Sequence, residues 1–296
     1  MTRPLSIIIP TYNRPKLLQR AVQSALAACP DGAEIIVVDD RSDTAESALH
    51  DVISDPRVTV LTNPGEKGAA GARNAGAQVA TGQILLFFDD DDTLIADYPG
   101  RVLAAAQTGA SFGFSARMRV ENGRQQAELR PELPTGMLPN DTPLSAKLAA
   151  FSAGYWVRRA VFAQVGPIAP DQVNDEDTDL CCKLYAQGHA AWYDPVPGCA
   201  VHSGYDTNDT TAPQLTQSTD PAAMVACYVR TFERHASGFQ SRPADHWFLL
   251  RRALRVAART GVDAGGNQLL QGLRPRSLQL KGWLFWQMKK AGQLLR

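Results

Sequence analysis

The stretch ILLFFDDDDTL, residues 84–94, places five apolar residues directly before four consecutive aspartates. A short apolar run of this kind is typical of a buried β-strand. Unit charges about 4 Å apart repel each other by roughly 4 kcal/mol at an effective dielectric constant of 20, so four carboxylates at a strand end are unfavourable without a cation among them. The stretch therefore indicates a cation site, with a solvated acidic strand end as the alternative.

Around this stretch, from residue 5 to about 108, apolar runs alternate with helical patterns. Such alternation is typical of βαβ units and predicts an α/β fold, a mostly parallel sheet flanked by helices. The other predicted strands are LSIIIP (5–10), EIIVVDD (34–40) and RVTVLT (57–62). The predicted helices begin at Pro15, with Asn13 as the capping residue, and cover residues 44–53 and 68–80.

Polar side chains follow three of these strands, at the edge where open α/β sheets bind ligands. They are Tyr12 and Asn13, Asp39 and Asp40, and the four aspartates Asp89, Asp90, Asp91 and Asp92. If the fourth strand persists, pleating points Asp89 and Asp91 to one side and Asp90 and Asp92 to the other. Two carboxylates on one side make half of a site for a hard cation.

After residue 110 the alternation of strands and helices ends. The sequence predicts a strand at 111–120, a proline-rich loop at 127–143 and a helix at 156–166 that Gly166 closes. A second acidic cluster, Asp175, Glu176, Asp177 and Asp179, opens a further helix, where acidic residues also complement the helix macrodipole. We expect a catalytic domain over residues 1–210, with a nucleotide-sugar half of about 1–108 and an acceptor half of about 109–210, and a helical C-terminal extension over 211–296.

Five segments match a known pattern in order and spacing. They are SIIIPTYNRP (6–15), IIVVDDRS (35–42), GAAGARNAGAQVATGQILLFFDDDD (68–92), VRRAVFAQVG (157–166) and NDEDTDLCCKLYAQGHAAWYDPVPGCAVH (174–202). Over residues 1 to about 205 the chain resembles family-2 glycosyltransferases of the GT-A fold. The resemblance implies transfer of a sugar from a nucleoside-diphosphate sugar to an acceptor hydroxyl, with inversion at the anomeric carbon.

The resemblance also implies roles for individual residues. Pro10 and Tyr12 would border the nucleobase, and Asp40, with Asp39 beside it, would bond the base. The aspartates Asp89, Asp90 and Asp91 fall on the element that holds the ribose and a Mn²⁺ or Mg²⁺ ion, and His202 would lie near the diphosphate as a further metal ligand. Asp177 would be the general base. Two points stay open: Asp91 or Asp92 as principal metal ligand, and Asp177 or Glu176 as base.

The chemistry of such a transfer is consistent with these residue types. A diphosphate leaving group needs a cation to neutralise it, and the attacking hydroxyl needs a separate carboxylate to take its proton. Arg73 is the cation of segment 68–80 that can meet the donor, or else an exposed arginine on a packed helix. Tyr155 and Trp156 could stack on an acceptor sugar, or else belong to the core.

Two other functions compete with transfer. A sugar nucleotidyltransferase should carry a glycine-rich phosphate loop after the first strand, where this chain has PTYNRP. A catalytically silent nucleotide-sugar-binding module should lack either the metal carboxylates or the base. Neither a zinc site nor a dinucleotide-binding dehydrogenase fits, because cysteine–histidine pairs at ligand spacing and a Gly-Xaa-Gly-Xaa-Xaa-Gly segment after the first strand are both missing from the sequence.

Charge and cysteine content bear on partners and location. Lys plus Arg and Asp plus Glu both number 30, which gives no reason to expect a nucleic-acid partner. An odd number of cysteines, five, argues against a disulfide framework, and residues 1–15 lack the pattern of a secretory signal. We therefore expect a cytoplasmic protein, peripheral at the inner face of the plasma membrane if its tail binds lipid.

The tail LQLKGWLFWQMKKAGQLLR, residues 278–296, allows two interpretations. Apolar residues recur at helical spacing beside basic ones, namely Leu280, Trp283, Leu284, Met288, Ala291 and Leu295 beside Lys281, Lys289, Lys290 and Arg296. Such a helix can lie in a membrane interface and bring the enzyme to a lipid-linked saccharide acceptor. Because Phe285 and Trp286 widen the apolar face, the alternative is a helix packed on the catalytic domain or on a second subunit of a homodimer.

Overall fold

The computed structural model describes residues 3–43, 55–130, 132–151, 154–203 and 219–294. The strands are β1 Leu5–Thr11, β2 Glu34–Asp39, β3 Val58–Thr62, β4 Ile84–Phe87, β5 Thr93–Leu94, β6 Phe112–Glu121, β7 Arg124–Glu128, β8 Gly136–Met137, β9 Trp156–Arg158 and β10 Ala191–Ser203. The helices are α1 Pro15–Ala28, α3 Ala69–Val79, α4 Tyr98–Gln107, α5 Leu144–Ala150, α6 Arg159–Val165, α7 Glu176–Ala186, α9 Pro221–His235, the short 3₁₀ helix η2 Ala236–Phe239, α10 Pro243–Thr260, α11 Asp263–Gly272 and α12 Arg276–Leu294.

The strands form one mixed sheet in the order β3-β2-β1-β4-β9-β6-β10-β5, with β7 beside β6 and β8 beside β10. The first four strands in that order run parallel, and Ile8 of β1 lies between Ile36 of β2 and Phe87 of β4. Strand β9 is antiparallel to both of its neighbours, β4 and β6, while β6 and β10 are parallel. The predicted parallel order therefore holds for the N-terminal half and gives way to mixed pairing after β4.

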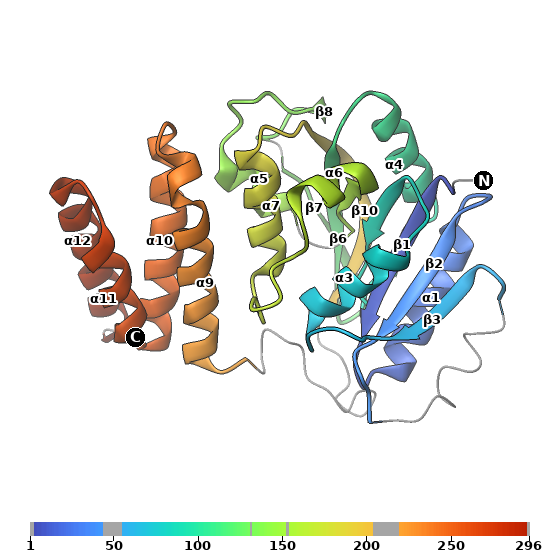
Figure 1. The fold of residues 1–296 in the computed structure, drawn as a ribbon, viewed down its shortest axis with the longest axis horizontal. Coiled ribbons are helices and arrows are strands. Elements are labelled where there is room, and N and C mark those ends of the chain that lie inside the picture. Colours follow the sequence, from blue (N-terminus) through green and yellow to red (C-terminus); the bar gives the residue numbers. More distant parts are fainter. Residues whose placement is uncertain (1–2, 44–54, 131, 152–153, 204–218, 295–296) are drawn as a thin grey trace.

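Helices cover both faces of the sheet, which confirms the predicted α/β fold (Figure 1). Successive side chains of β1 alternate between the two cores: Ile8 packs with α3, α6 and α7, whereas Ile7 and Ile9 pack with α1 and α4. This alternation follows from the pleat and explains why the strands are apolar throughout. The carboxyl ends of β1, β2 and β4 thus lie side by side.

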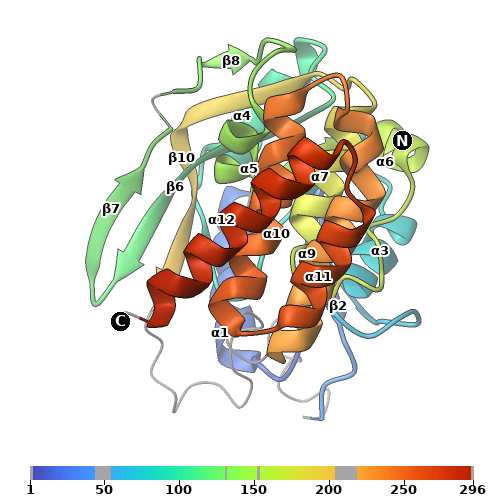
Figure 2. The same ribbon diagram turned by 90° about the vertical axis from the view of Figure 1, so that its left-hand side faces the viewer.

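The C-terminal helices α9, α10, α11 and α12 build a third core against α7 and α5, at the left of Figure 1 and in front in Figure 2. Cys182 and Tyr185 of α7 are buried in this core with Phe232 of α9 and Leu250 of α10. The predicted helical extension is present. The predicted boundary at residue 210 lies outside the described residues, and no helix within them is long and apolar enough to cross a membrane.

Three local predictions differ from the structure, and a fourth lies outside the described residues. The residue that precedes α1 is Arg14, so Asn13 is not the capping residue, although Pro15 opens the helix as predicted. The segment 156–166 begins as strand β9 rather than as a helix, because Trp156 pairs with β4 and β6. Strand β8 interrupts the predicted loop 127–143. The helix expected at 44–53 lies outside the described residues.

Candidate active site

The four aspartates of residues 89–92 form a turn beyond β4 rather than a continuation of it. Strand β4 ends at Phe87, and the amide of Asp92 donates a hydrogen bond to the carbonyl of Asp89 (3.4 Å). Side chains alternate across a pleat only within a strand, so the expected separation of Asp92 from Asp89 and Asp91 is wrong. The turn brings carboxylate oxygens of Asp89, Asp91 and Asp92 within 4.8 Å of one another.

Asp90, by contrast, fastens this turn to β1. Its buried carboxylate accepts hydrogen bonds from the hydroxyl of Thr11 (2.7 Å) and from Arg14 (3.2 Å), and Arg14 also reaches Asp91 (3.3 Å). Burial, followed by the charge of Asp91, raises the pKa of Asp90 to about 7. Both oxygens of Asp90 thus bond to protein groups, so its role in nucleotide-sugar binding stays a prediction.

The other three aspartates fit a divalent cation. Burial and the charge of Asp89 raise the pKa of Asp91, and burial with the charges of Asp89 and Asp91 raises that of Asp92 well above its usual range. Carboxylates that share a site raise one another's pKa values, and a cation among them favours the charged forms. Carboxylate oxygens are the ligands that Mg²⁺ and Mn²⁺ prefer. The donor set thus matches the predicted metal.

His202 lies against this cluster through its backbone. The amide of His202 donates to Asp92 (3.3 Å), while its ring atom Nε2 lies 2.8 Å from the hydroxyl of Thr93. Burial lowers the pKa of His202, so the ring is neutral near pH 7. Within the described residues, the group of close ligand atoms consists of the three aspartates without a histidine nitrogen. His202 as a metal ligand stays a prediction.

Arg73 of α3 joins the two acidic clusters. Its guanidinium donates to Asp89 (2.6 Å) on one side and to Glu176 at the start of α7 (2.7 Å) on the other. The arginine is buried, which corrects the alternative of an exposed side chain on a packed helix. Arg73 thus forms ion pairs with both acidic clusters. Its side chain links the turn 89–92 to the first turn of α7.

Asp177 follows Glu176 and is partly exposed. Its carboxylate accepts a hydrogen bond from the amide of Thr178 (2.6 Å). Burial, followed by the charges of Glu176 and Asp175, raises the pKa of Asp177 to about 7. A carboxylate with a pKa near neutrality is suited to exchange protons at physiological pH.

The C-terminal helices anchor this end of α7. Arg252 of α10 pairs with Asp175 (2.6 Å), whose backbone adopts the left-handed conformation (φ +68°) directly before the helix. Asp179, one turn into α7, accepts from Arg234 (3.1 Å) and lies 2.9 Å from the ring of His235. Both carboxylates are buried, so these ion pairs fix the start of α7 to α9 and α10.

The ends of β1 and β2 form the remaining wall of the site. Asp40 is buried and accepts from the side chain of Asn63 (2.6 Å) and from the amide of Gly68 (2.7 Å), so it shapes the loop that leads into α3. Asp39 accepts from the hydroxyl of Ser42 (2.6 Å). Pro10 lies within the buried strand β1. The centre of the Tyr12 ring lies 4.3 Å from Lys67 Nζ. Contact of these residues with a nucleobase stays a prediction.

The aromatic pair Tyr155 and Trp156 does not form an acceptor platform. Their exposed fractions are 2% and 1%, because β9 is a central strand that places Trp156 against Gly113 of β6 and stacks Tyr155 on Phe151 at 4.3 Å. The prediction of stacking on a sugar is therefore wrong. Among the described residues, the hydroxyl of Tyr155 nevertheless has no hydrogen-bond partner, and the charges of Arg73, Glu176 and Asp177 act on it.

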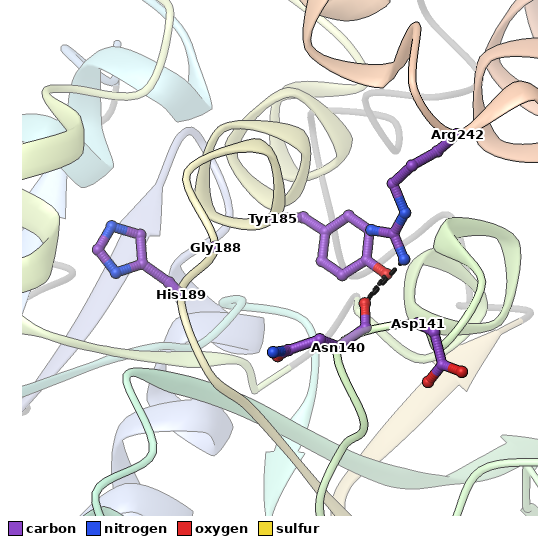
Figure 3. A pocket seen from close by; sticks show the side chains of 6 residues that line it. All are labelled: Asn140, Asp141, Tyr185, Gly188, His189 and Arg242. Carbon is purple, nitrogen blue, oxygen red and sulfur yellow. Dashed lines mark hydrogen bonds between the residues drawn. The ribbon is translucent and has the colours of Figure 1, made fainter.

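A cavity of about 400 Å³ lies at the opposite end of α7 (Figure 3). It is lined by Asn140, Asp141, Tyr185, Gly188, His189 and Arg242. Arg242 donates to the carbonyl of Asn140 (2.7 Å). Neither acidic cluster contributes to this lining, so the candidate chemistry is at the carboxyl ends of the strands and not in this cavity.

The sequence profile described as Glycosyl transferase family 2 matches residues 6–166, more than half of the chain. The chain belongs to glycosyl transferase family 2. The matched segment contains β1, α3 and the turn 89–92, and it ends before the second acidic cluster. The predicted family is thereby confirmed, and the α/β sheet described above is its GT-A fold.

Bacterial relatives of this glycosyltransferase support the assignment. An uncharacterized glycosyltransferase of Haemophilus influenzae is 26% identical over 236 residues, 78% of this chain and 79% of that protein. A GalNAc(5)-diNAcBac-PP-undecaprenol beta-1,3-glucosyltransferase of Campylobacter jejuni is 31% identical over 158 residues, which covers 51% of this chain and 50% of the relative. The Escherichia coli enzyme WfgD, a UDP-Glc:alpha-D-GlcNAc-diphosphoundecaprenol beta-1,3-glucosyltransferase, is 38% identical over 95 residues, 31% of this chain and 37% of WfgD.

A solved structure shows the same fold over nearly the whole glycosyltransferase. Residues 1–349 of Staphylococcus aureus TarS, in complex with UDP-GlcNAc, match with a TM-score of 0.65 and 16% identity. The match covers 99% of this chain and 92% of the TarS fragment. At this identity the likeness shows the fold alone.

Sequence reasoning missed two residues that shape the glycosyltransferase site, Arg14 and Arg252, and left the role of a third, Asp92, open. Arg14 was detectable, because it follows the end of β1 within the segment SIIIPTYNRP. Asp92 was named as an alternative metal ligand but assigned to the wrong side. Arg252 carried no signal in the sequence, since it lies 77 residues from Asp175 and shares its helix with three other arginines, Arg251, Arg255 and Arg259.

Proposed function

We propose that this glycosyltransferase moves a sugar from a nucleoside-diphosphate sugar to a hydroxyl of a saccharide or lipid-linked saccharide, with inversion and with a divalent cation, in bacterial cell-surface glycan synthesis. The observation that carries the proposal is the pair of acidic clusters joined by Arg73. One cluster suits a cation and the other suits a proton acceptor. An inverting transfer needs both, on opposite faces of the sugar.

On the donor side, Asp89, Asp91 and Asp92 would hold the cation, which when bound supplies positive charge to the leaving diphosphate. Arg73 lies beside Asp89 and brings positive charge to the donor side, and its buried Nε atom has no hydrogen-bond partner among the described residues. Tyr12 and Lys67 stand at the mouth of the same strand ends, where a nucleobase would lie.

On the acceptor side, the contacts favour Asp177 over Glu176 as the base. Glu176 is ion-paired with the buried Arg73, so one of its carboxylate oxygens is already engaged. Asp177 has a pKa raised to about 7 by burial and by Glu176, so it can take a proton from a hydroxyl. Glu176 thus raises the basicity of its neighbour while it holds Arg73.

The activities given in the names of two relatives are consistent with this proposal. The Campylobacter and WfgD relatives are glucosyltransferases whose names give undecaprenol-linked acceptors, and the name of WfgD gives UDP-Glc as donor. The TarS structure holds UDP-GlcNAc. We infer a nucleoside-diphosphate sugar as donor and a lipid-linked saccharide as the first acceptor class to test.

The test is a screen of nucleoside-diphosphate sugars with Mn²⁺ or Mg²⁺ and a set of saccharide and diphosphoprenyl-saccharide acceptors. We expect release of nucleoside diphosphate with at least one donor, and a product whose anomeric configuration, read by NMR, is opposite to that of the donor. Tight donor binding without transfer to any acceptor would favour the silent binding module. Formation of a nucleotide sugar from a nucleoside triphosphate and a sugar phosphate would favour the nucleotidyltransferase.

The ion pair between Arg252 and Asp175 gives a second prediction. Arg252→Met leaves a buried carboxylate next to α7 without its partner and removes a positive charge that lowers the pKa of Asp177. We expect a loss of kcat with little change in donor KM, and an acid limb of the pH–rate profile that moves to higher pH. Arg252→Lys should restore both in part.

The matched control is Arg101→Met. Arg101 of α4 is also half-buried and pairs with Asp194, but α4 packs in the core on the other face of the sheet from α7. Thermal unfolding should show comparable destabilisation of the two methionine variants. An acid limb that stays in place in Arg252→Met, or moves equally in Arg101→Met, would contradict the positioning role of Arg252.

A further inference from the structure

Helix α12 (Arg276–Leu294) carries apolar side chains on two sides, and one side is packed. Trp286 is 3% exposed and lies over Gly266 of α11, where an added Cβ would come within 2.4 Å of the indole ring. Phe285 packs edge-on against Trp247 of α10, with ring centroids 5.7 Å apart. Phe285 and Trp286, the residues that widen the apolar pattern of the tail, thus belong to the inner side.

The outer side of α12 is apolar and exposed. Leu280, Trp283, Leu284 and Met288 are 58%, 47%, 54% and 58% exposed. Their spacing of three and four residues places them on one face of the helix. The other exposed large apolar side chains of the described residues, Val79, Leu129, Met137, Val173 and Val196, lie on other elements. A contiguous apolar face on a surface helix marks an interaction site.

The charge around this outer face has one sign. Residues 264–296 contain no acidic residue and six basic ones, Arg274, Arg276, Lys281, Lys289, Lys290 and Arg296. Arg276, four residues before Leu280, and Lys281 are exposed and border the outer face, whereas Lys289 lies over the inward-packed ring of Phe285. Lys290 is paired with Asp263 and contributes less. An anionic bilayer complements apolar side chains flanked by cations.

A second copy of the chain fits the outer face of α12 less well than an anionic bilayer does. Two copies docked through this face would bring the lysines and arginines of both helices together, and like charges repel. Helix α12 also forms the outermost layer of the C-terminal helices, as Figure 2 shows face-on. Its outer face therefore has no neighbour among the described residues.

We propose that the outer face of α12, formed by Leu280, Trp283, Leu284 and Met288 and flanked by Arg276 and Lys281, lies in the interface of an anionic lipid bilayer. The apolar side chains enter the boundary between headgroups and acyl chains, and the basic side chains contact the lipid phosphates. The helix lies along the surface of the bilayer. Binding of this kind is independent of sugar transfer, so it goes beyond the proposed function.

The test is co-sedimentation of the full chain with vesicles of phosphatidylcholine alone, or of equal parts phosphatidylcholine and phosphatidylglycerol. We expect binding to the anionic vesicles and at least about tenfold weaker binding to the neutral ones. Replacing the four outer residues by glutamine (Leu280, Trp283, Leu284, Met288) should abolish binding. The matched control, four exposed apolar residues elsewhere replaced by glutamine (Val79, Leu129, Met137, Val196), should bind like the unaltered chain.

A charge variant separates the two contributions. The double change Arg276→Gln and Lys281→Gln should weaken binding to anionic vesicles about 25-fold, about fivefold for each cation, and leave binding to neutral vesicles unchanged. Circular dichroism and thermal unfolding establish that each variant is folded, and we expect no change because the altered side chains are exposed.

Several results would overturn the proposal. These are failure of the unaltered chain to bind anionic vesicles, full binding by the variant of the outer face, and equal loss in the control variant. Sedimentation velocity without lipid tests whether a second copy of the chain binds the outer face instead. A dimer that becomes a monomer in the outer-face variant would assign this face to dimer formation.

Discussion

Replacement of Asp177 by asparagine is expected to lower kcat by about 10²- to 10⁴-fold while donor affinity changes little, because the loss of a general base affects the proton transfer and not the binding of the nucleotide. Asparagine keeps the shape of the side chain and can still lie beside the amide of Thr178. The measurement is kcat and KM for the donor under saturating acceptor, together with the affinity for nucleoside diphosphate.

The pH–rate profile provides an independent readout of the same prediction. Burial and Glu176 raise the pKa of Asp177 to about 7, and only the deprotonated carboxylate can accept a proton. For the unaltered enzyme, kcat/KM should therefore fall about tenfold for each pH unit below 7 and level off above it. In Asp177→Asn this acid limb should be absent.

The adjacent residue supplies the control. Glu176→Gln breaks the ion pair with Arg73, which also holds Asp89, so it should weaken donor binding more than it slows proton transfer. If Glu176→Gln loses turnover and the acid limb while Asp177→Asn keeps both, the roles of the two carboxylates are exchanged. If both variants turn over nearly normally, this cluster does not supply the base.

Replacement of Asp91 by asparagine is expected to weaken Mn²⁺ affinity by more than about 100-fold and to abolish metal-dependent transfer. The reason is that Asp91 supplies one of three carboxylates whose oxygens lie within 4.8 Å, and changes to outer partners of metal ligands alone cost about 10- to 100-fold. Calorimetric titration with Mn²⁺ and the dependence of activity on metal concentration measure the two effects.

The neighbouring Asp90 is the matched control for the metal prediction. Asp90→Asn removes a carboxylate of the same run that bonds to Thr11 and Arg14 and lies outside the close group, so it should lower thermal stability more than metal affinity. Turnover that survives both a chelator and Asp91→Asn would show that the aspartates do not hold a catalytic cation.

The parts of the fold that follow from local patterns were predictable. The apolar runs and the position of Pro15 correctly located four strands and two helices, namely β1, β2, β3, β4, α1 and α3. Buried strands and amphipathic helices can be located in this way because each repeats its pattern of apolar residues within a short stretch of sequence. The short strand β9 was not predictable: three residues are too few for a period, and their pairing depends on β4 and β6, which lie far away in sequence.

The same distinction holds for the site. Both acidic clusters were visible in the sequence because each is a continuous run. The carboxylate oxygens that come together are set by the turn after Phe87, where strand β4 ends. Side chains no longer alternate between the two faces of the sheet in this turn, so Asp92 lies with Asp89 and Asp91. The bridge made by Arg73 spans 16 residues on one side and 103 on the other, so tertiary contact alone sets it.

Strand β9 (Trp156–Arg158) has a consequence for building chimeric enzymes. It is hydrogen-bonded to β4 on one side and to β6 on the other, so the two predicted halves, about 1–108 and 109–210, share it. A chain cut near residue 108 would leave the edge of β4 unpaired beside the buried Leu85 and Leu86, and such apolar edges promote aggregation. The predicted nucleotide-sugar half, if exchanged between relatives, must therefore carry the segment 154–158 with it, although 45 residues of the other half precede that segment in the chain.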